Sequence, residues 1–342
     1  MTLTINTNIS AMIAERNFNN ATNLLNKSLE RLSTGYTINH AADNAAGYSI
    51  SDNWVAQLSS YDSAASNASM GADLLNTAEQ NYDLLTEHLS RVRDLTVQAA
   101  NGTYGSISLK AIQAEIRTRF QEISRIASNS EFNGIKLMSY ADDVKDTGLN
   151  ESGINLQVGI FSDDDSVINV GIDLFKNATV SGLFNGKSYK QGTETYNIDT
   201  YVTGAANGKV SDFKYNSDAG YEVIAAACSK LKVSSVTDGH YEFEIQYEQD
   251  LGPEKMIGFI DKAIDEISNR VTRIGTAQNR IESAISSIEV QQQNLTSSLS
   301  TLRDTDVARE SSKYIQSQIL QQASATLLSA ANQTPSIALN LI

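Results

Sequence analysis

The sequence predicts a mainly α-helical protein. We expect a long antiparallel coiled-coil rod made from both chain ends, with a β-hairpin and a small strand-rich (α+β) outer domain inserted between them. Three observations predict this fold. Apolar residues recur at alternating spacings of three and four through both ends of the 342-residue chain. The chain contains only two prolines, so long helices can continue without interruption. In the middle of the chain, which holds most of the 20 glycines, apolar residues alternate with polar ones instead.

The N-terminal rod segment, residues 48–177, contains two predicted helices. From Trp54 to Ala99 the apolar positions form one coiled-coil seam, which slips by one residue after Leu75. A second helix follows a turn at Asn101–Gly105. One face of this second helix collects Leu109, Ile112, Ile116, Phe120, Ile123 and Ala127.

The C-terminal rod helix is predicted over residues 253–297. Pro253 can occupy its first position, where a proline loses no required hydrogen bond. Its seam runs through Ile260, Ile264, Ile267, Val271, Ile274, Ile281, Ile285 and Ile288, and continues through Leu295, Leu299 and Leu302. We expect the three long helices to pack into one rod.

The two extreme ends, residues 1–47 and 298–342, are amphipathic but weak helix formers. The first is rich in asparagine, so it is marginal as an isolated helix. We expect both ends to be disordered in the monomer and to pack by their apolar faces. These predicted contact residues are Ile5, Ile9, Met12, Leu25 and Leu32 at one end, and Ile315, Ile319, Ala323, Leu327 and Leu341 at the other.

The middle of the chain is predicted to contain strands. Residues 156–172 indicate a β-hairpin with an acidic turn at Asp163–Asp165. Residues 178–252 are predicted to form the variable outer domain, with strands near 195–202, 210–215 and 241–247 and a short helix near 221–231.

The residues that catalysis needs are scarce. There is one cysteine, Cys228, and there are three histidines, which are too far apart in sequence for a metalloprotease helix. The run Asp163–Asp165 lacks the spacing of a calcium loop, and no nucleotide-binding glycine motif is present. We therefore predict no enzyme activity, no metal and no cofactor.

Charge and hydropathy exclude other partners. The net charge of −14 argues against nucleic acid, and no apolar stretch is long enough for membrane insertion. No ordinary signal peptide begins the chain, which alone indicates the cytoplasm.

Three interpretations of the periodicity remain open: a self-assembling structural protein, an adaptor that docks on a different partner, and an ordinary helical bundle.

Residues 29–47, LERLSTGYTINHAADNAAG, closely resemble the signature of the bacterial flagellins. Four C-terminal segments agree in order and spacing: Gly275–Arg280, Asp304–Ala308, Gln318–Ala323 and Ala331–Gln333. The resemblance covers about residues 1–177 and 253–342. It implies a subunit that polymerises into the extracellular flagellar filament for motility, after unfolded export by the flagellar type III apparatus. It also replaces the cytoplasmic prediction and implies that the ends line the filament core.

The resemblance further implies partners. These are other copies of the chain, the flagellar cap, the hook–filament junction proteins and an export chaperone. A host Toll-like receptor is a further implied partner, with Arg91, Leu95 and Glu115 as the matching contact residues. The alternative interpretation of these residues is that Leu95 continues the helical seam while Arg91 and Glu115 form solvated or intersubunit ion pairs.

Two other functions fit the same export family. A hook–filament junction protein shares the terminal helices but does not polymerise. An enzyme inserted in the middle is a third hypothesis, although His240 is the only histidine there.

Overall fold

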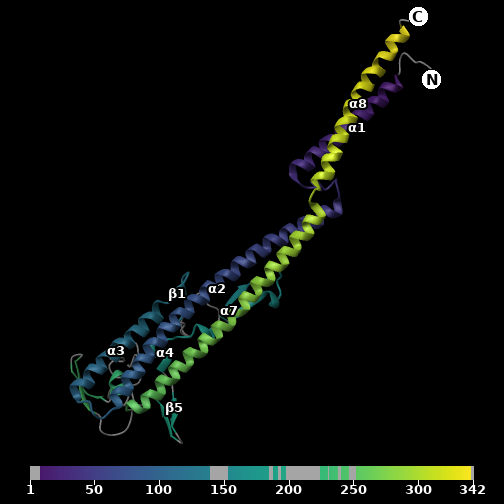
Figure 1. The fold of residues 1–342 in the computed structure, drawn as a ribbon. Helices are drawn as coiled ribbons and strands as arrows, with labels where there is room; N and C mark the ends of the chain where they lie inside the picture. Colours follow the sequence, from purple (N-terminus) through teal and green to yellow (C-terminus); the bar gives the residue numbers. More distant parts are fainter. Residues whose placement is uncertain are drawn as a thin grey trace. The chain divides into compact units, whose positions relative to one another are not determined.

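The computed structural model divides into two units. The terminal unit comprises Met1–Asp62 and Glu289–Ile342, and the central unit comprises Ser63–Ile288. The structure describes residues 8–138, 153–184, 188–191, 194–197, 224–229, 231–237, 240–245 and 252–339. Two long helices, α2 (Ala45–Ala100) and α7 (Pro253–Arg303), contribute to both units (Figure 1).

In the central unit α2 and α7 run antiparallel. Arg93 on α2 pairs with Asp261 on α7, and Gln278 on α7 donates to Glu79 on α2. The predicted seam of α2 is buried after the slip at Leu75. Helix α7 begins at Pro253, as predicted, but it continues through the predicted boundary at residue 297 to Arg303.

Helix α3 (Ser106–Asn129) packs on this pair. All six residues of its predicted apolar face are buried. It is followed by a short hairpin of β1 (Glu131–Phe132) and β2 (Ile135–Lys136). The turn residues Asn133 and Gly134 have φ of 49° and 79°, which is the backbone that a two-residue type I′ hairpin requires.

The predicted hairpin with an acidic turn is confirmed. Strand β3 (Ile154–Gln157) pairs antiparallel with β4 (Val167–Val170), and the aspartate run leads into a 3₁₀ turn at Asp164–Ser166. Ile168 and Val170 are buried in the central core. Leu156 lies so close to Gly71 on α2 that a Cβ at Gly71 would come within 2.5 Å of it.

Parts of the predicted outer domain belong to the central core. Helix α4 (Val180–Phe184) and a helical turn at 224–228 are buried in the same cluster as α2, α3 and α7. Beyond them, β5 (Ser188–Gln191) pairs with β6 (Glu194–Asn197), and β7 (Leu231–Thr237) pairs with β8 (His240–Ile245). The strand predicted near 210–215 lies outside the described residues.

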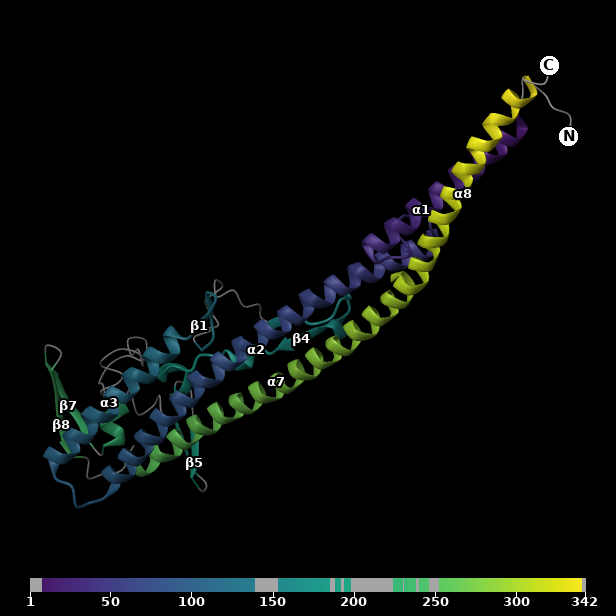
Figure 2. The same ribbon diagram turned by 45° about the horizontal axis from the view of Figure 1, so that its top comes forward.

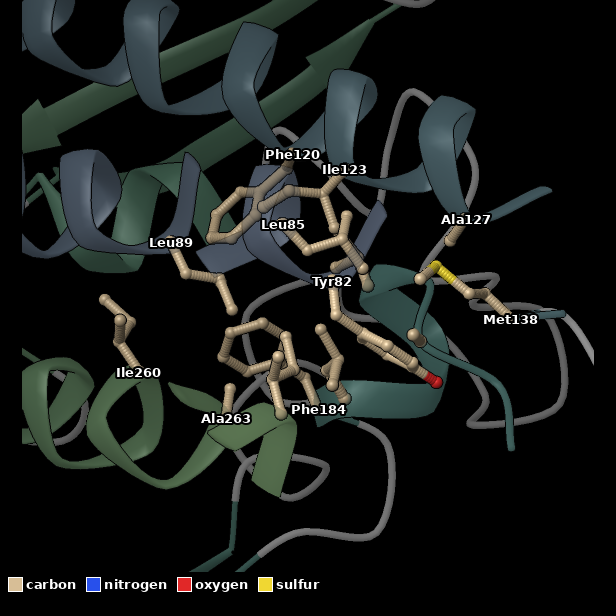
Figure 3. Packing of buried hydrophobic residues seen from close by; sticks show 14 of the residues in the cluster. Tyr82, Leu85, Leu89, Phe120, Ile123, Ala127, Met138, Phe184, Ile260 and Ala263 are labelled. Carbon is tan, nitrogen blue, oxygen red and sulfur yellow. The ribbon is translucent and has the colours of Figure 1, made fainter. Parts of the chain in front are cut away.

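Figure 3 shows the centre of this core, where side chains from α2, α3, α4 and α7 meet. The rings of Phe120 and Phe184 pack edge to face at 5.7 Å. The Tyr82 hydroxyl donates a hydrogen bond to the Leu174 carbonyl at 2.6 Å, and burial raises the pKa of this phenol. Cys228 is fully buried in another part of the same core, beside Thr96 on α2, and its burial raises the pKa of the thiol to about 12.

The terminal unit is built on a second antiparallel pair, α1 (Ile9–Thr34) and α8 (Val307–Leu339) (Figures 1 and 2). Asn8, the residue before α1, donates to the Ala331 carbonyl at 2.8 Å, and Gln321 donates to Thr22 at 3.1 Å. Asn8 also caps α1 by accepting from the Ala11 amide.

A short backbone clasp, Gly35–Thr37 with Arg303–Thr305, joins the ends of these helices. The Thr37 amide donates to the Arg303 carbonyl at 2.6 Å, and the Thr305 amide donates to the Gly35 carbonyl at 2.8 Å. The Arg303 guanidinium lies 4.4 Å from the centre of the Tyr36 ring, within cation–π range. The clasp therefore ties the exit of α1 to the entry of α8.

Candidate functional site

The α1–α8 interface is a heptad seam made mostly of small and polar side chains. Partly or fully buried positions alternate at spacings of three and four along both helices. On α1 the seam positions are Ala11, Ala14, Phe18, Ala21, Leu25, Ser28 and Leu32, and on α8 they are Glu310, Tyr314, Ser317, Gln321, Ser324, Leu328 and Ala331.

The terminal unit consequently has almost no apolar core. Among the described residues, its only fully buried apolar side chains are Ala21 and Ile38, whereas the other buried apolar residues lie in the central unit. Because each buried large apolar side chain contributes about 1.5–3 kcal/mol, the central unit has a large source of stability that the terminal unit lacks.

Large apolar side chains of α8 lie instead on its outer surface. Ile315, Ile319 and Leu327 are 55%, 60% and 64% exposed. At 3.6 residues per turn, Ile315, Ile319 and Ala323 lie on roughly the opposite side of α8 from the seam, and Leu327 lies at the edge of this surface, beside the seam. We call these four residues the outer stripe.

Helix α1 carries a shorter exposed apolar surface. Ile9, Met12 and Ile13 are exposed in its first two turns, and Leu24 and Leu29 are exposed beside the seam. The rest of the outward side is polar, with Arg16, Asn20 and Asn23. Helix α8 thus presents the more continuous apolar surface.

The predicted contact residues fall into three groups. Leu25 and Leu32 are half-buried in the α1–α8 seam. Ile5 and Leu341 lie outside the described residues. The exposed group comprises Ile9, Met12, Ile315, Ile319, Ala323 and Leu327.

The seam of α8 was missed because it is not apolar. Periodic hydrophobicity identifies the outer stripe, whereas the positions that face α1 are Glu310, Ser317, Gln321 and Ser324. The exposed Val307 and Leu320 were also missed. The repeating three-and-four spacing of small and polar residues from Glu310 to Ala331 is the signal that could have revealed the seam.

Two carboxylates of the terminal unit, Asp43 and Glu310, have pKa values below their ordinary values. The hydrogen bond from Lys27 lowers the pKa of Asp43 to about 2, and the amides of Asn39 and His40 contribute in the same direction. Burial works to raise the pKa of Glu310, but Ser28, Lys313 and Arg31 outweigh it, so this pKa lies below its ordinary value. Both groups are therefore ionised at neutral pH.

The predicted receptor residues are only partly brought together. Arg91 on α2 and Glu115 on α3 form an ion pair at 3.0 Å on the surface of the central unit. Leu95 is buried in the core beneath the surface of α2, as its place in the helical seam predicts. The surface available to a partner at this place is therefore polar.

No chemical centre competes with these surfaces in the part of the chain that the structure describes. There, no three or more histidine, cysteine or acidic side chains are grouped so that they could hold a metal ion. None of the helices searched among these residues combines the length and the hydropathy of a membrane span.

Fold and surface together define a class, that of coiled-coil structural proteins whose terminal helices leave apolar surface for other molecules. Two family models match the chain. The bacterial flagellin N-terminal helical region matches residues 5–142, and the bacterial flagellin C-terminal helical region matches residues 257–342. The chain belongs to the bacterial flagellins, so it is a structural protein of the extracellular flagellar filament and not an enzyme.

Individual relatives match along their whole length. The chain is 31% identical to flagellin B of Vibrio cholerae over 379 residues, with all of both chains covered. It is 32% identical to flagellin B of Vibrio anguillarum over 392 residues and to polar flagellin A of Vibrio parahaemolyticus over 379 residues, again with complete coverage.

Proposed function

We propose that filament growth buries the outer stripe of α8 and the first turns of α1 between copies of the chain. The observation that supports this is the inversion of the terminal unit, which has small side chains in its internal seam and large apolar side chains on its surface. Such a unit gains most of its burial from neighbours, so α1 and α8 are the parts that assembly completes.

Seeded elongation tests this proposal. Covering the exposed part of Ile319 contributes about 1–2 kcal/mol, so Ile319→Ser should raise the critical concentration for elongation roughly 5- to 30-fold. Ile107→Ser is the matched control, because Ile107 is 85% exposed but lies on α3 in the central unit. Equal critical concentrations for the two variants would refute the proposal.

We also propose that the chain is exported unfolded through the flagellar type III apparatus. The weak seam of α1 and α8 supports this, since a pair with little buried apolar surface is easily separated. An export chaperone and the flagellar cap would then handle the same terminal segments. Stabilising the α1–α8 pair with a disulfide should block secretion in a flagellated host, and reduction should restore it.

The alternative function is that of a hook–filament junction protein. The same seeded assay separates the two functions, because a junction protein adds to a seed without continued growth. We favour the filament subunit, since the full-length relatives are flagellins.

Recognition by a Toll-like receptor is a second proposed property. The adjacent Arg91 and Glu115 offer a charged surface, and Leu95 would act by supporting α2 from within. Arg91→Ala should therefore weaken receptor activation with unchanged thermal stability, whereas Leu95→Ala should lower both.

A further inference from the structure

Glu310 is buried in the α1–α8 interface. Few of the other fully buried side chains there would fix how the two helices are aligned. Glu310 is 4% exposed, which makes it the most buried charged residue among the described residues of α1 and α8. The other fully buried positions of the seam are Ala21, Ser28, Ser317 and Ser324, which are similar in size and do not by themselves exclude a shift of one heptad.

Groups from both helices satisfy the Glu310 carboxylate. Ser28 on α1 donates to Oε1 at 2.8 Å, and Lys313 on α8 lies 3.1 Å from Oε2. Arg31 on α1 lies 3.9 Å from the same oxygen. A buried charge with these partners is tolerated, whereas the same charge without them is strongly unfavourable.

Other alignments would remove the two partners that α1 supplies, Ser28 and Arg31. Sliding α8 by one heptad along α1 in one direction would place Glu310 against Ala21, a buried position that offers no donor side chain. Pairing α8 with a second α8 would likewise deprive Glu310 of Ser28 and Arg31. The small side chains at the fully buried seam positions do not exclude these arrangements, but a buried carboxylate without its α1 partners disfavours them.

We infer that Glu310 is a positioning residue for assembly: with Ser28 and Arg31 it selects the α1–α8 pairing and register that turns the outer stripe toward neighbouring copies. This inference rests on the proposed function, because it concerns how the surface used in growth is presented. The clasp acts at the same end of the pair, so the backbone and the carboxylate select the same alignment.

Disulfide trapping in elongated filaments tests the inference. Thr22→Cys with Gln321→Cys reports the native register, because these side chains are hydrogen-bonded in the structure. Glu15→Cys with Gln321→Cys reports a slide of one heptad. Cys228 does not interfere, since it is buried and burial raises its thiol pKa to about 12. On non-reducing gels an intrachain disulfide remains a monomer, whereas an interchain disulfide gives a dimer.

With Glu310 present, we expect the native pair to form intrachain disulfides and the displaced pair to form few. Glu310→Leu should lower the ratio of native to displaced plus interchain products at least fivefold. Ser317→Leu is the matched control, because it adds the same side chain to the seam one heptad away and leaves Glu310 in place. An unchanged ratio in Glu310→Leu would overturn the inference.

Two further results keep the test decisive. If Glu310→Leu does not elongate, Ser28→Ala should shift the ratio in the same direction by a smaller factor, and no shift would again overturn the inference. If the cysteine variants that retain Glu310 fail to elongate on seeds, the proposed function fails instead. The two failures are therefore distinguishable.

Discussion

At the scale of single residues, the segment that resembles the flagellin signature has a physical reason at several positions. Gly35 ends α1 with φ of +77°, a backbone conformation that glycine adopts most easily. Asp43 accepts from two backbone amides and pairs with Lys27 at 2.6 Å. Gly47 leaves room for the buried Ile38, whose side chain a Cβ would approach within 2.8 Å.

Asp43 gives a prediction about acid. Its pKa of about 2 lies below the ordinary value of 3.8, so its stabilising contribution is present above about pH 4 and is lost as the pH falls toward 2. Asp43→Asn should therefore weaken filaments at pH 7, and the difference from the parent should shrink between about pH 4 and pH 2. Light scattering across this range measures it, and Asp52→Asn, at an exposed site on α2, should show no such convergence.

Gly35 gives a prediction about backbone strain. Gly35→Ala should destabilise the end of α1 by about 1 kcal/mol, because a Cβ is unfavourable at positive φ even in open space. We expect the critical concentration for elongation to rise about fivefold. Gly275→Ala, in the middle of α7 and also in open space, should cause no loss.

At the scale of elements, apolar periodicity predicted both the helix and its buried face where the apolar residues are the ones that pack inside the molecule. The faces of α3 and of α2 after Leu75 are examples, because their apolar residues are the buried ones. In α8 the relation is reversed. Ile315, Ile319 and Leu327 form the visible stripe, whereas Ser317 and Ser324 face α1, so hydrophobicity alone located the helix but not its internal partner.

Tyr82 gives a prediction about the central core. Tyr82→Phe removes the donor to the Leu174 carbonyl and a partner of Arg270 at 3.4 Å, which should cost about 1–3 kcal/mol. Calorimetry should show a thermal midpoint lower by about 2–4 °C for each kcal/mol lost. Tyr104→Phe is the control, because the hydrogen bond of Tyr104 with Gln98 is exposed and water can replace it.

At the scale of the whole molecule, the two units differ in what stabilises them. Among the residues that the structure describes, the central unit contains nearly all the buried apolar ones, whereas the terminal unit contains Ala21 and Ile38. The sequence predicted that the extreme ends are less stable than the rod, but it could not show which face of α1 and α8 is covered, because the apolar periodicity of α8 marks its exposed side. The predicted seam of α7 extends through Leu302, and the helix ends at Arg303, although the predicted segment boundary is residue 297.

This contrast predicts the order of proteolysis. In the monomer, limited digestion should first remove segments of α1 and α8 and leave a fragment that contains Ser63–Ile288. Assembly into filaments should protect the same sites, as mass spectrometry of the fragments would show. Initial cleavage inside α2 between Leu75 and Ala99 would contradict this account.

The burial of the Cys228 thiol predicts how filaments change during long storage in oxygenated water. It is the only cysteine in the chain, it is fully buried, and with a pKa of about 12 it carries almost no thiolate near neutrality. Long exposure to air should therefore create no disulfide bonds between subunits. Old polymer should remain as reversible as new polymer, and both should dissolve completely to single chains without any reducing agent.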